Sequence, residues 1–103
     1  MKSITTDELK NKLLESKPVQ IVDVRTDEET AMGYIPNAKL IPMDTIPDNL
    51  NSFNKNEIYY IVCAGGVRSA KVVEYLEANG IDAVNVEGGM HAWGYEGLEI
   101  KSI

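Results

Sequence analysis

Apolar residues along the chain fall into short unbroken runs and into stretches with helical spacing. Four short runs rich in branched and aromatic residues predict buried strands at residues 19–24, 38–41, 58–63 and 82–86. Capping signals and helical spacing predict helices at residues 4–16, 26–33, 44–53, 69–80 and 88–93. Strands that are apolar on both faces need cover on both sides. The pattern therefore predicts a three-layer α/β domain with a central, mostly parallel sheet of about five strands, flanked by helices on both faces.

Two of the predicted helices begin with the same local signal. Thr5 is followed by Glu8, and Thr26 by Glu29, which is the Thr-x-x-Glu spacing of a capping box. In such a box, each side chain accepts a hydrogen bond from the backbone N–H of the other residue. We expect the apolar stripes of the first and longest helices to be formed by Leu9, Leu13 and Leu14 and by Val72, Val73 and Leu76.

Composition narrows the class of protein. The 103 residues are sufficient for one domain, residues 1–103, with a core of ordinary size. A net charge of −6 argues against nucleic-acid binding, because a phosphate backbone would be repelled. The sequence has no apolar run long enough to span a membrane, and its start does not resemble a secretory signal. A single cysteine cannot form an internal disulfide, which fits a reducing, cytoplasmic location.

That cysteine, Cys63, stands where a predicted strand ends and a helix is about to begin. In parallel α/β folds, ligands bind beyond the carboxyl ends of the strands. Gly65 and Gly66 permit backbone turns that point successive N–H groups inward, and a helix starting near Ser69 adds its partial positive charge. These features predict a lowered thiol pKa and a nucleophilic role for Cys63. Arg68 would either face a bound anion or pair with a carboxylate.

The residues alone leave a structural role for Cys63 open, because a lone cysteine after an apolar strand is often a small buried hydrophobic residue. Asp23 and Arg25, at the end of another strand, are expected to pair and support the loop, or Arg25 adds positive potential there. His91 has no second histidine or cysteine cluster to complete a metal site, so no metal is expected.

Four stretches in order resemble the signatures of the rhodanese-like domain family, specifically its stand-alone single-domain type. They are IVDVRTDEETAMGYIPNAKLIPM (21–43), CAGGVRS (63–69), YLEANGI (75–81) and GGMHAW (88–93). The four stretches follow one another in the order of the family, so the resemblance covers nearly the whole chain. The chain departs from the family pattern at Tyr34, where histidine is frequent, at Asn37, where glycine is frequent, and at Ala64, where many members have a basic or polar residue.

The resemblance implies a sulfurtransferase. Cys63 would take the outer sulfur of a donor (thiosulfate, a persulfide or a polysulfide) as a covalent persulfide. It would then pass that sulfur to cyanide, a thiol or a protein cysteine, with no metal or organic cofactor. The amides expected to hold the persulfide are those of Ala64, Gly65, Gly66, Val67, Arg68 and Ser69. The uncharged Ala64 weakens the expectation of thiosulfate as donor and favours a persulfide or polysulfide, including one presented by a protein.

Two other functions stay open at this point. Cysteine phosphatases and arsenate reductases also place an anion between a cysteine and an arginine, but with five residues between the two. Cys63 and Arg68 are separated by four, and a smaller ring of amides suits a sulfur atom better than a tetrahedral oxyanion. A non-catalytic binding or regulatory module of the same family is the other alternative, although such relatives are expected to lack the cysteine.

Overall fold

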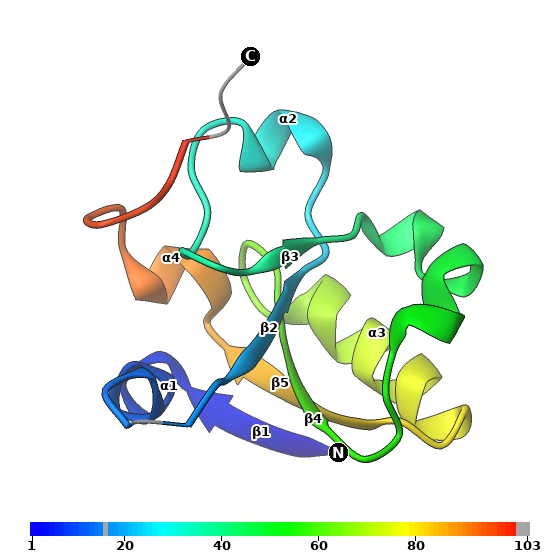
Figure 1. Cartoon of the computed structure of the whole chain (residues 1–103). Coiled ribbons are helices and arrows are strands. Elements are labelled where there is room, and N and C mark those ends of the chain that lie inside the picture. The colour runs from blue at the N-terminus through cyan, green and yellow to red at the C-terminus, as the bar shows by residue number, and fades with distance from the viewer. Residues whose placement is uncertain (16, 101–103) are drawn as a thin grey trace.

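The centre of the protein is one parallel sheet. In the computed structural model, which describes residues 1–15 and 17–100, five strands are arranged in the order β1-β5-β4-β2-β3 (Figure 1). They are β1 (Lys2–Thr5), β2 (Gln20–Asp23), β3 (Lys39–Leu40), β4 (Ile58–Val62) and β5 (Asp82–Glu87). Each neighbouring pair is parallel, so all carboxyl ends lie at the same edge of the sheet. The predicted fold class is confirmed.

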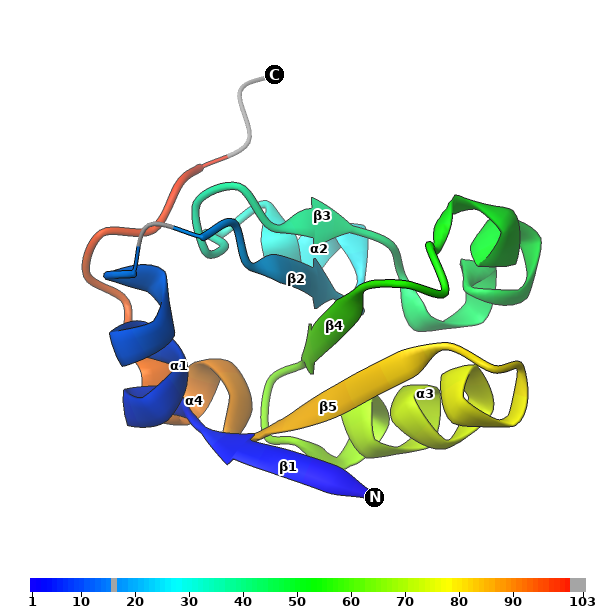
Figure 2. The ribbon, with the colours of Figure 1, turned by 60° about the horizontal axis from the view of Figure 1, so that its bottom comes forward.

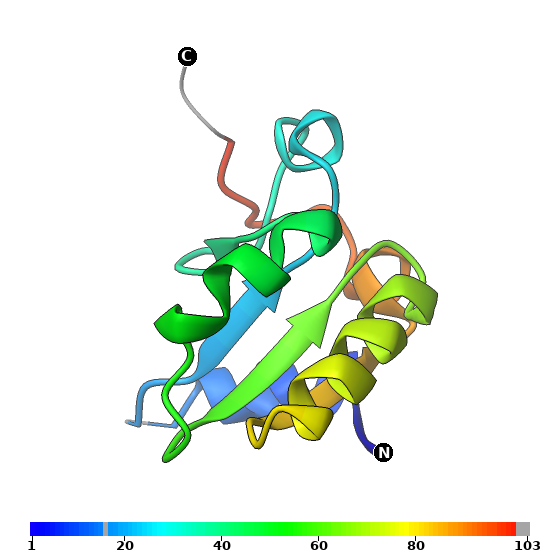
Figure 3. The same ribbon diagram turned by 90° about the vertical axis from the view of Figure 1, so that its right-hand side faces the viewer.

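Helices cover both faces of this sheet. α1 (Thr6–Leu13) and α4 (Gly89–Trp93) lie on one face, and α3 (Val67–Ala78) lies on the other (Figure 2). Two 3-10 helices, η1 (Met43–Thr45) and η2 (Pro47–Ser52), share the face of α3 (Figure 3). The short α2 (Asp27–Thr30) follows β2 at the carboxyl edge of the sheet (Figure 1).

The alternation of side chains along β4 divides the core into two clusters. Tyr59, Ile61 and Cys63 belong to the cluster beneath α3, whereas Tyr60 and Val62 belong to the cluster beneath α1 and α4. The predicted face of α3 is confirmed, because its three stripe residues, Val72, Val73 and Leu76, are all buried. Cys63 directly follows β4, and it is therefore both a core residue and the first residue of the loop after the strand.

Local signals in the sequence correctly predict the starts of two helices. Both predicted capping boxes are present, with Thr5 and Glu8 at the start of α1 and Thr26 and Glu29 at the start of α2. Asn37 has a φ of 69°, the left-handed conformation that asparagine tolerates better than most residues.

Other local predictions are wrong. Leu13 is 39% exposed and Leu14 is 86% exposed, because α1 ends at Leu13 and its buried contact is made mainly by Leu9. The helix predicted at residues 44–53 is instead the pair η1 and η2, and Pro47 starts the second of them because it cannot donate to the preceding turn. Strand β1 was not predicted, because it contributes one buried apolar side chain and runs directly into a helix cap.

Candidate active site

The loop that connects β4 to α3 carries the cysteine. Gly66 caps α3 with a φ of 100°, a conformation that L side chains rarely adopt, and a Cβ there would lie 3.3 Å from the amide nitrogen of Gly88. The conformational role expected of both glycines thus applies to Gly66, whereas Gly65 is absent from the positive-φ residues of the described chain. The helix begins two residues before its predicted start, at Val67, directly beside the cysteine.

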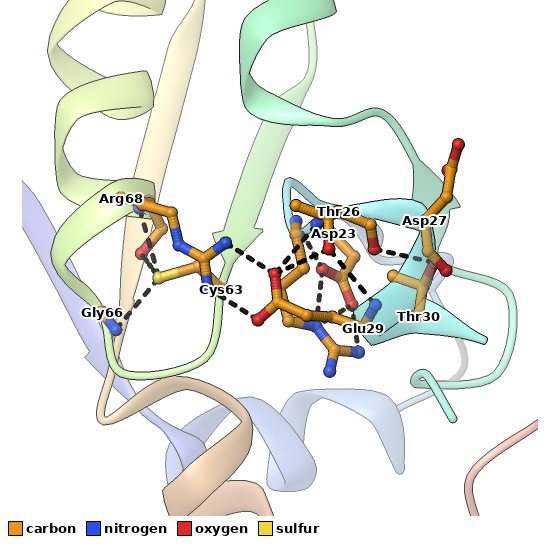
Figure 4. A network of polar contacts seen from close by, with 10 residues as sticks. Asp23, Thr26, Asp27, Glu29, Thr30, Cys63, Gly66 and Arg68 are labelled. Atoms are coloured by element: carbon orange, nitrogen blue, oxygen red, sulfur yellow. Dashed lines mark hydrogen bonds and ion pairs between the residues drawn. The ribbon is translucent and has the colours of Figure 1, made fainter. Parts of the chain in front are cut away.

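The Cys63 thiol faces the backbone amides of this loop, as predicted. Its Sγ accepts hydrogen bonds from the N–H groups of Gly66 at 3.1 Å and Ser69 at 3.3 Å, and it lies 3.3 Å from the Ser69 hydroxyl (Figure 4). The residue is only 1% exposed, so the sulfur lies at the bottom of the loop. A reacting partner must therefore reach it with a narrow terminal group.

The surroundings of the thiol lower its pKa. Burial acts in the opposite direction and is the largest single influence, because it disfavours the charged thiolate. The Ser69 hydroxyl, when its proton turns to the sulfur, and the N–H groups of Ser69, Gly66 and Gly65 together outweigh it, so the net shift of the Cys63 pKa is downward. This direction agrees with the sequence-based prediction, and it favours nucleophilic chemistry.

The N-terminus of α4 fixes the carbonyl side of the same loop. The N–H groups of Met90 and His91 donate to the carbonyl oxygens of Cys63 at 2.9 Å and Ala64 at 3.0 Å. Gly89 makes this approach possible, because a Cβ at that position would overlap the carbonyl oxygens of both Cys63 and Ala64. With these carbonyl groups bound to α4, the later N–H groups of the loop are free to face the sulfur.

Arg68 pairs with a carboxylate, which is one of the two roles expected of it. Its guanidinium donates to both carboxylate oxygens of Glu29, at 2.7 and 2.9 Å, across the gap between α3 and α2 (Figure 4). Arg68 first, and then the N–H and hydroxyl of Thr26, lower the pKa of Glu29 to about 2 against the opposing effect of burial. The pair ties the first turn of α3 to the capping box of α2.

Asp23 and Arg25 also pair, as expected. The Arg25 guanidinium donates to Asp23 at 2.8 to 3.1 Å and to the carbonyl oxygen of Gly33 at 2.8 Å, and both side chains are buried. Arg25 thus ties the end of β2 to the segment after α2, and its charge is already matched by Asp23.

Asn85 on β5 is a site residue that the sequence analysis missed. Its Oδ1 accepts a hydrogen bond of 2.5 Å from the Ser69 hydroxyl, and its Nδ2 donates to the carbonyl oxygen of Gly66 at 3.3 Å. The available signal was a polar residue in the otherwise apolar run AVNV, because a buried amide requires hydrogen-bond partners.

Two of the loop side chains are uncharged, and the described residues hold no cluster that could bind a metal ion. Ala64 is half-buried and Val67 is exposed, and neither brings a charge to the sulfur. Within residues 1–15 and 17–100, no three His, Cys, Asp or Glu side chains are grouped closely enough to hold a metal ion.

The fold and the site together define a parallel α/β domain in which a buried cysteine faces the backbone N–H groups at the start of α3. The chain belongs to the rhodanese-like domain family, whose model matches residues 5–96. A crystal structure of a rhodanese-like domain protein from Staphylococcus aureus is 99% identical, covers 99% of this chain and 100% of that one, and superimposes with a TM-score of 0.98.

Two curated relatives match most of the chain. YtwF of Bacillus subtilis (strain 168) is 43% identical over 93 residues, which cover 90% of each protein. A protein named sulfurtransferase from Allochromatium vinosum is 37% identical over 98 residues, which cover 94% of this chain and 92% of that protein. Among the described residues, no helix is long and apolar enough to cross a membrane.

Proposed function

We propose that the chain is a rhodanese-type sulfurtransferase that carries sulfur as a persulfide on Cys63. The observation that carries this proposal is the position of Sγ, which accepts hydrogen bonds from the N–H groups of Gly66 and Ser69 at the start of α3. A thiol in this position is stabilised as the anion, and no adjacent general base is required. The name of the Allochromatium vinosum relative supports the same activity.

In the first half-reaction, the Cys63 thiolate attacks the outer sulfur of a donor. A new S–S bond forms on Sγ, and the bond between the two sulfurs of the donor breaks. The leaving group departs with the electron pair, as a thiolate from a persulfide, as a polysulfide shortened by one sulfur from a polysulfide, or as sulfite from thiosulfate. The negative charge then lies on the outer sulfur of the persulfide, where the remaining loop amides, from Ala64 to Ser69, are the available donors.

In the second half-reaction, an acceptor nucleophile attacks that outer sulfur. Cyanide, a small thiol or a cysteine of another protein forms a bond to it, and the Cys63 thiolate leaves with the electron pair. The same N–H groups that stabilise the starting thiolate stabilise this leaving group, so the cycle closes without a cofactor.

The charges around the loop favour donors of low charge. Arg68 is paired with Glu29, and Arg25 is paired with Asp23, so each guanidinium is already matched by a carboxylate. Ala64, the residue after the cysteine, brings no cation to the loop that would help to bind a dianion such as thiosulfate. We therefore propose a persulfide or polysulfide as the donor, either free or held by a partner protein, with a narrow terminal sulfur that reaches the buried Sγ.

The same pairing argues against a phosphatase or arsenate reductase. Those enzymes need the loop arginine to face the bound oxyanion. In this protein, the two terminal nitrogens of the Arg68 guanidinium, Nη1 and Nη2, donate to the carboxylate of Glu29 instead. The four-residue spacing between cysteine and arginine leaves the loop smaller as well.

The test is intact-mass spectrometry of the protein after incubation with a small organic persulfide, whose sulfur carries one negative charge, or with thiosulfate, which carries two. We expect a mass gain of one sulfur atom on Cys63, faster with the persulfide, and its removal by cyanide as thiocyanate. Cys63→Ser, which keeps a small polar side chain, should gain no sulfur and should transfer none. Sulfur transfer by Cys63→Ser at the wild-type rate would overturn the proposal, and so would a wild-type protein that gains no sulfur from either donor.

A further inference from the structure

The Ser69 hydroxyl lies between two acceptors. On one side is the Cys63 Sγ at 3.3 Å, and on the other is the Asn85 Oδ1 at 2.5 Å. Ser69 is fully buried, and Asn85 is 7% exposed, so bulk water does not readily replace either contact. The three side chains form a line from the loop, through the first turn of α3, to the middle of β5.

The orientation of the Asn85 amide is fixed by its other contact. Its Nδ2 donates to the carbonyl oxygen of Gly66, which can only accept, so its Oδ1 must face Ser69. A serine hydroxyl has one proton to donate. While that proton is directed at Asn85, Ser69 presents only lone pairs to the sulfur.

This arrangement suits a neutral thiol and opposes a thiolate. The S–H of Cys63 donates to Ser69, and Ser69 donates to Asn85, so every group in the line is satisfied. The thiolate has no proton to donate, and it gains from the Ser69 hydroxyl only if that hydroxyl turns away from Asn85. The Asn85 Oδ1 then loses its donor and faces the oxygen of Ser69 at short range, which is unfavourable for buried acceptors.

We propose that Asn85 is a positioning residue that competes with the Cys63 thiolate for the single proton of the Ser69 hydroxyl. Resting on the proposed function, this gives the hydroxyl two positions in the cycle. It turns to Sγ while the charge is on that atom, and it returns to Asn85 when persulfide formation moves the charge to the outer sulfur. Asn85 thereby limits thiolate formation at rest and helps the persulfide state.

Charged groups near the line come from several elements, and the test leaves all of them in place. Arg68 of α3 is paired with Glu29 of α2, and Arg25 is paired with Asp23 at the end of β2. His91 of α4 lies beside the loop, where its Nδ1 is the nearest atom to a Cβ built on Gly65. Substitutions at Asn85 and Ser69 change none of these groups, and only Asn85→Asp adds a charge of its own.

The experiment measures the rate of alkylation of Cys63 by iodoacetamide as a function of pH, which is specific because Cys63 is the only cysteine. Below the thiol pKa, the rate is proportional to the thiolate fraction. Asn85→Ala frees the Ser69 hydroxyl, so the rate in this range should rise by about three- to tenfold. In a Ser69→Ala background, Asn85→Ala should change the rate by less than about twofold, because the hydroxyl that carries the effect is gone.

Asn85→Asp gives an independent test, because the aspartate side chain has nearly the same shape as that of asparagine. A carboxyl group accepts the Ser69 proton more strongly, and its charge repels a thiolate, so alkylation should slow and its profile should move to higher pH. A purely structural role would shift both Asn85 variants in the same direction. The proposal is overturned if Asn85→Ala alkylates no faster than wild type, if its effect persists without the Ser69 hydroxyl, or if Asn85→Asp alkylates faster.

Thermal unfolding monitored by circular dichroism checks that each variant is folded before its profile is compared. If Asn85→Ala does not fold, the Asn85→Asp and Ser69→Ala profiles still decide the outcome, because the proposal requires slower alkylation of the aspartate variant. Alkylation needs no sulfur donor. Its result therefore stands separately from persulfide formation, and a failure of either proposal can be distinguished from a failure of the other.

Discussion

The two capping boxes of the protein have the same local geometry and different tertiary surroundings. Before α1, Glu8 accepts from the Thr5 N–H at 3.0 Å, and its own N–H donates to the Thr5 hydroxyl at 3.1 Å. Before α2, Glu29 and Thr26 form the same two contacts at 3.0 and 3.3 Å. The difference is that the Glu29 carboxylate also accepts two hydrogen bonds from Arg68.

The titration of the two carboxylates reflects this difference. The pKa of Glu8 is lowered, first by the Thr5 N–H, and Glu8 is fully exposed. The pKa of Glu29 is lowered to about 2, chiefly by Arg68. One box therefore only starts a helix, whereas the other starts a helix and also connects it to the cysteine loop. The comparison teaches that a local motif acquires a functional role through what the fold brings beside it.

The largest expected effect comes from breaking the connection itself. Arg68→Ala should lower the rate of sulfur transfer by about tenfold or more, because the first turn of α3 carries the amides that face Sγ and small displacements there are costly. Lys71→Ala removes a cation from the same helix without touching the ion pair, and it should leave the rate within about twofold of wild type. An Arg68→Ala rate equal to that of Lys71→Ala would contradict a connecting role.

A smaller effect is expected from removing each cap. Thr5→Ala and Thr26→Ala each delete a side-chain acceptor, and each should lower the free energy of unfolding by about 1 kcal/mol in a urea titration. Only Thr26→Ala should also slow sulfur transfer, because Thr26 positions the carboxylate that holds Arg68. Equal losses of activity in the two variants would show that the second box has no special connection to the site.

The smallest effect concerns the dependence of stability on pH. The pKa of Glu29 is lower in the folded protein than its ordinary value of 4.5, so its contribution is complete above that pH and is lost as the pH falls through about 2. The pair is partly exposed, and screening reduces this contribution to about 1 kcal/mol. In a plot of the free energy of unfolding against pH, Glu29→Gln should therefore make the decline between pH 4.5 and about pH 2 less steep.

Glu8→Gln is the matched control for that profile, because it changes the same residue type in the same motif. Its carboxylate is fully exposed and interacts mainly within its own helix, so the flattening should be smaller than for Glu29→Gln. A larger flattening for Glu8→Gln would reverse the comparison between the two boxes.

The sequence predicted those features that depend on neighbouring residues. The runs VQIVDV and IYYIVC are apolar on both faces, and in the fold they are the central strands β2 and β4. Both capping boxes follow from residues three positions apart. The position of Cys63 beside the start of a helix also follows from local order, because the strand ends and the helix begins within the same short segment.

Features that depend on distant residues could not be predicted in the same way. Arg68 and Glu29 are 39 positions apart, and Ser69 and Asn85 are 16 apart, so their pairing depends on how α2, α3 and β5 meet. Gly89 shows the same limit. A glycine pair is visible in the sequence, but its reason is the close approach of the Cys63 and Ala64 carbonyl groups.

The most direct test of the account is the pH dependence of Cys63 alkylation in the wild-type protein. The loop amides favour the thiolate, so the midpoint of the profile should lie below the value of about 8.5 that is typical of a free cysteine. Unfolding the chain in urea should move the midpoint back to that value. A folded protein whose midpoint lies at or above that of the unfolded chain would contradict the claim that this loop stabilises an anionic sulfur.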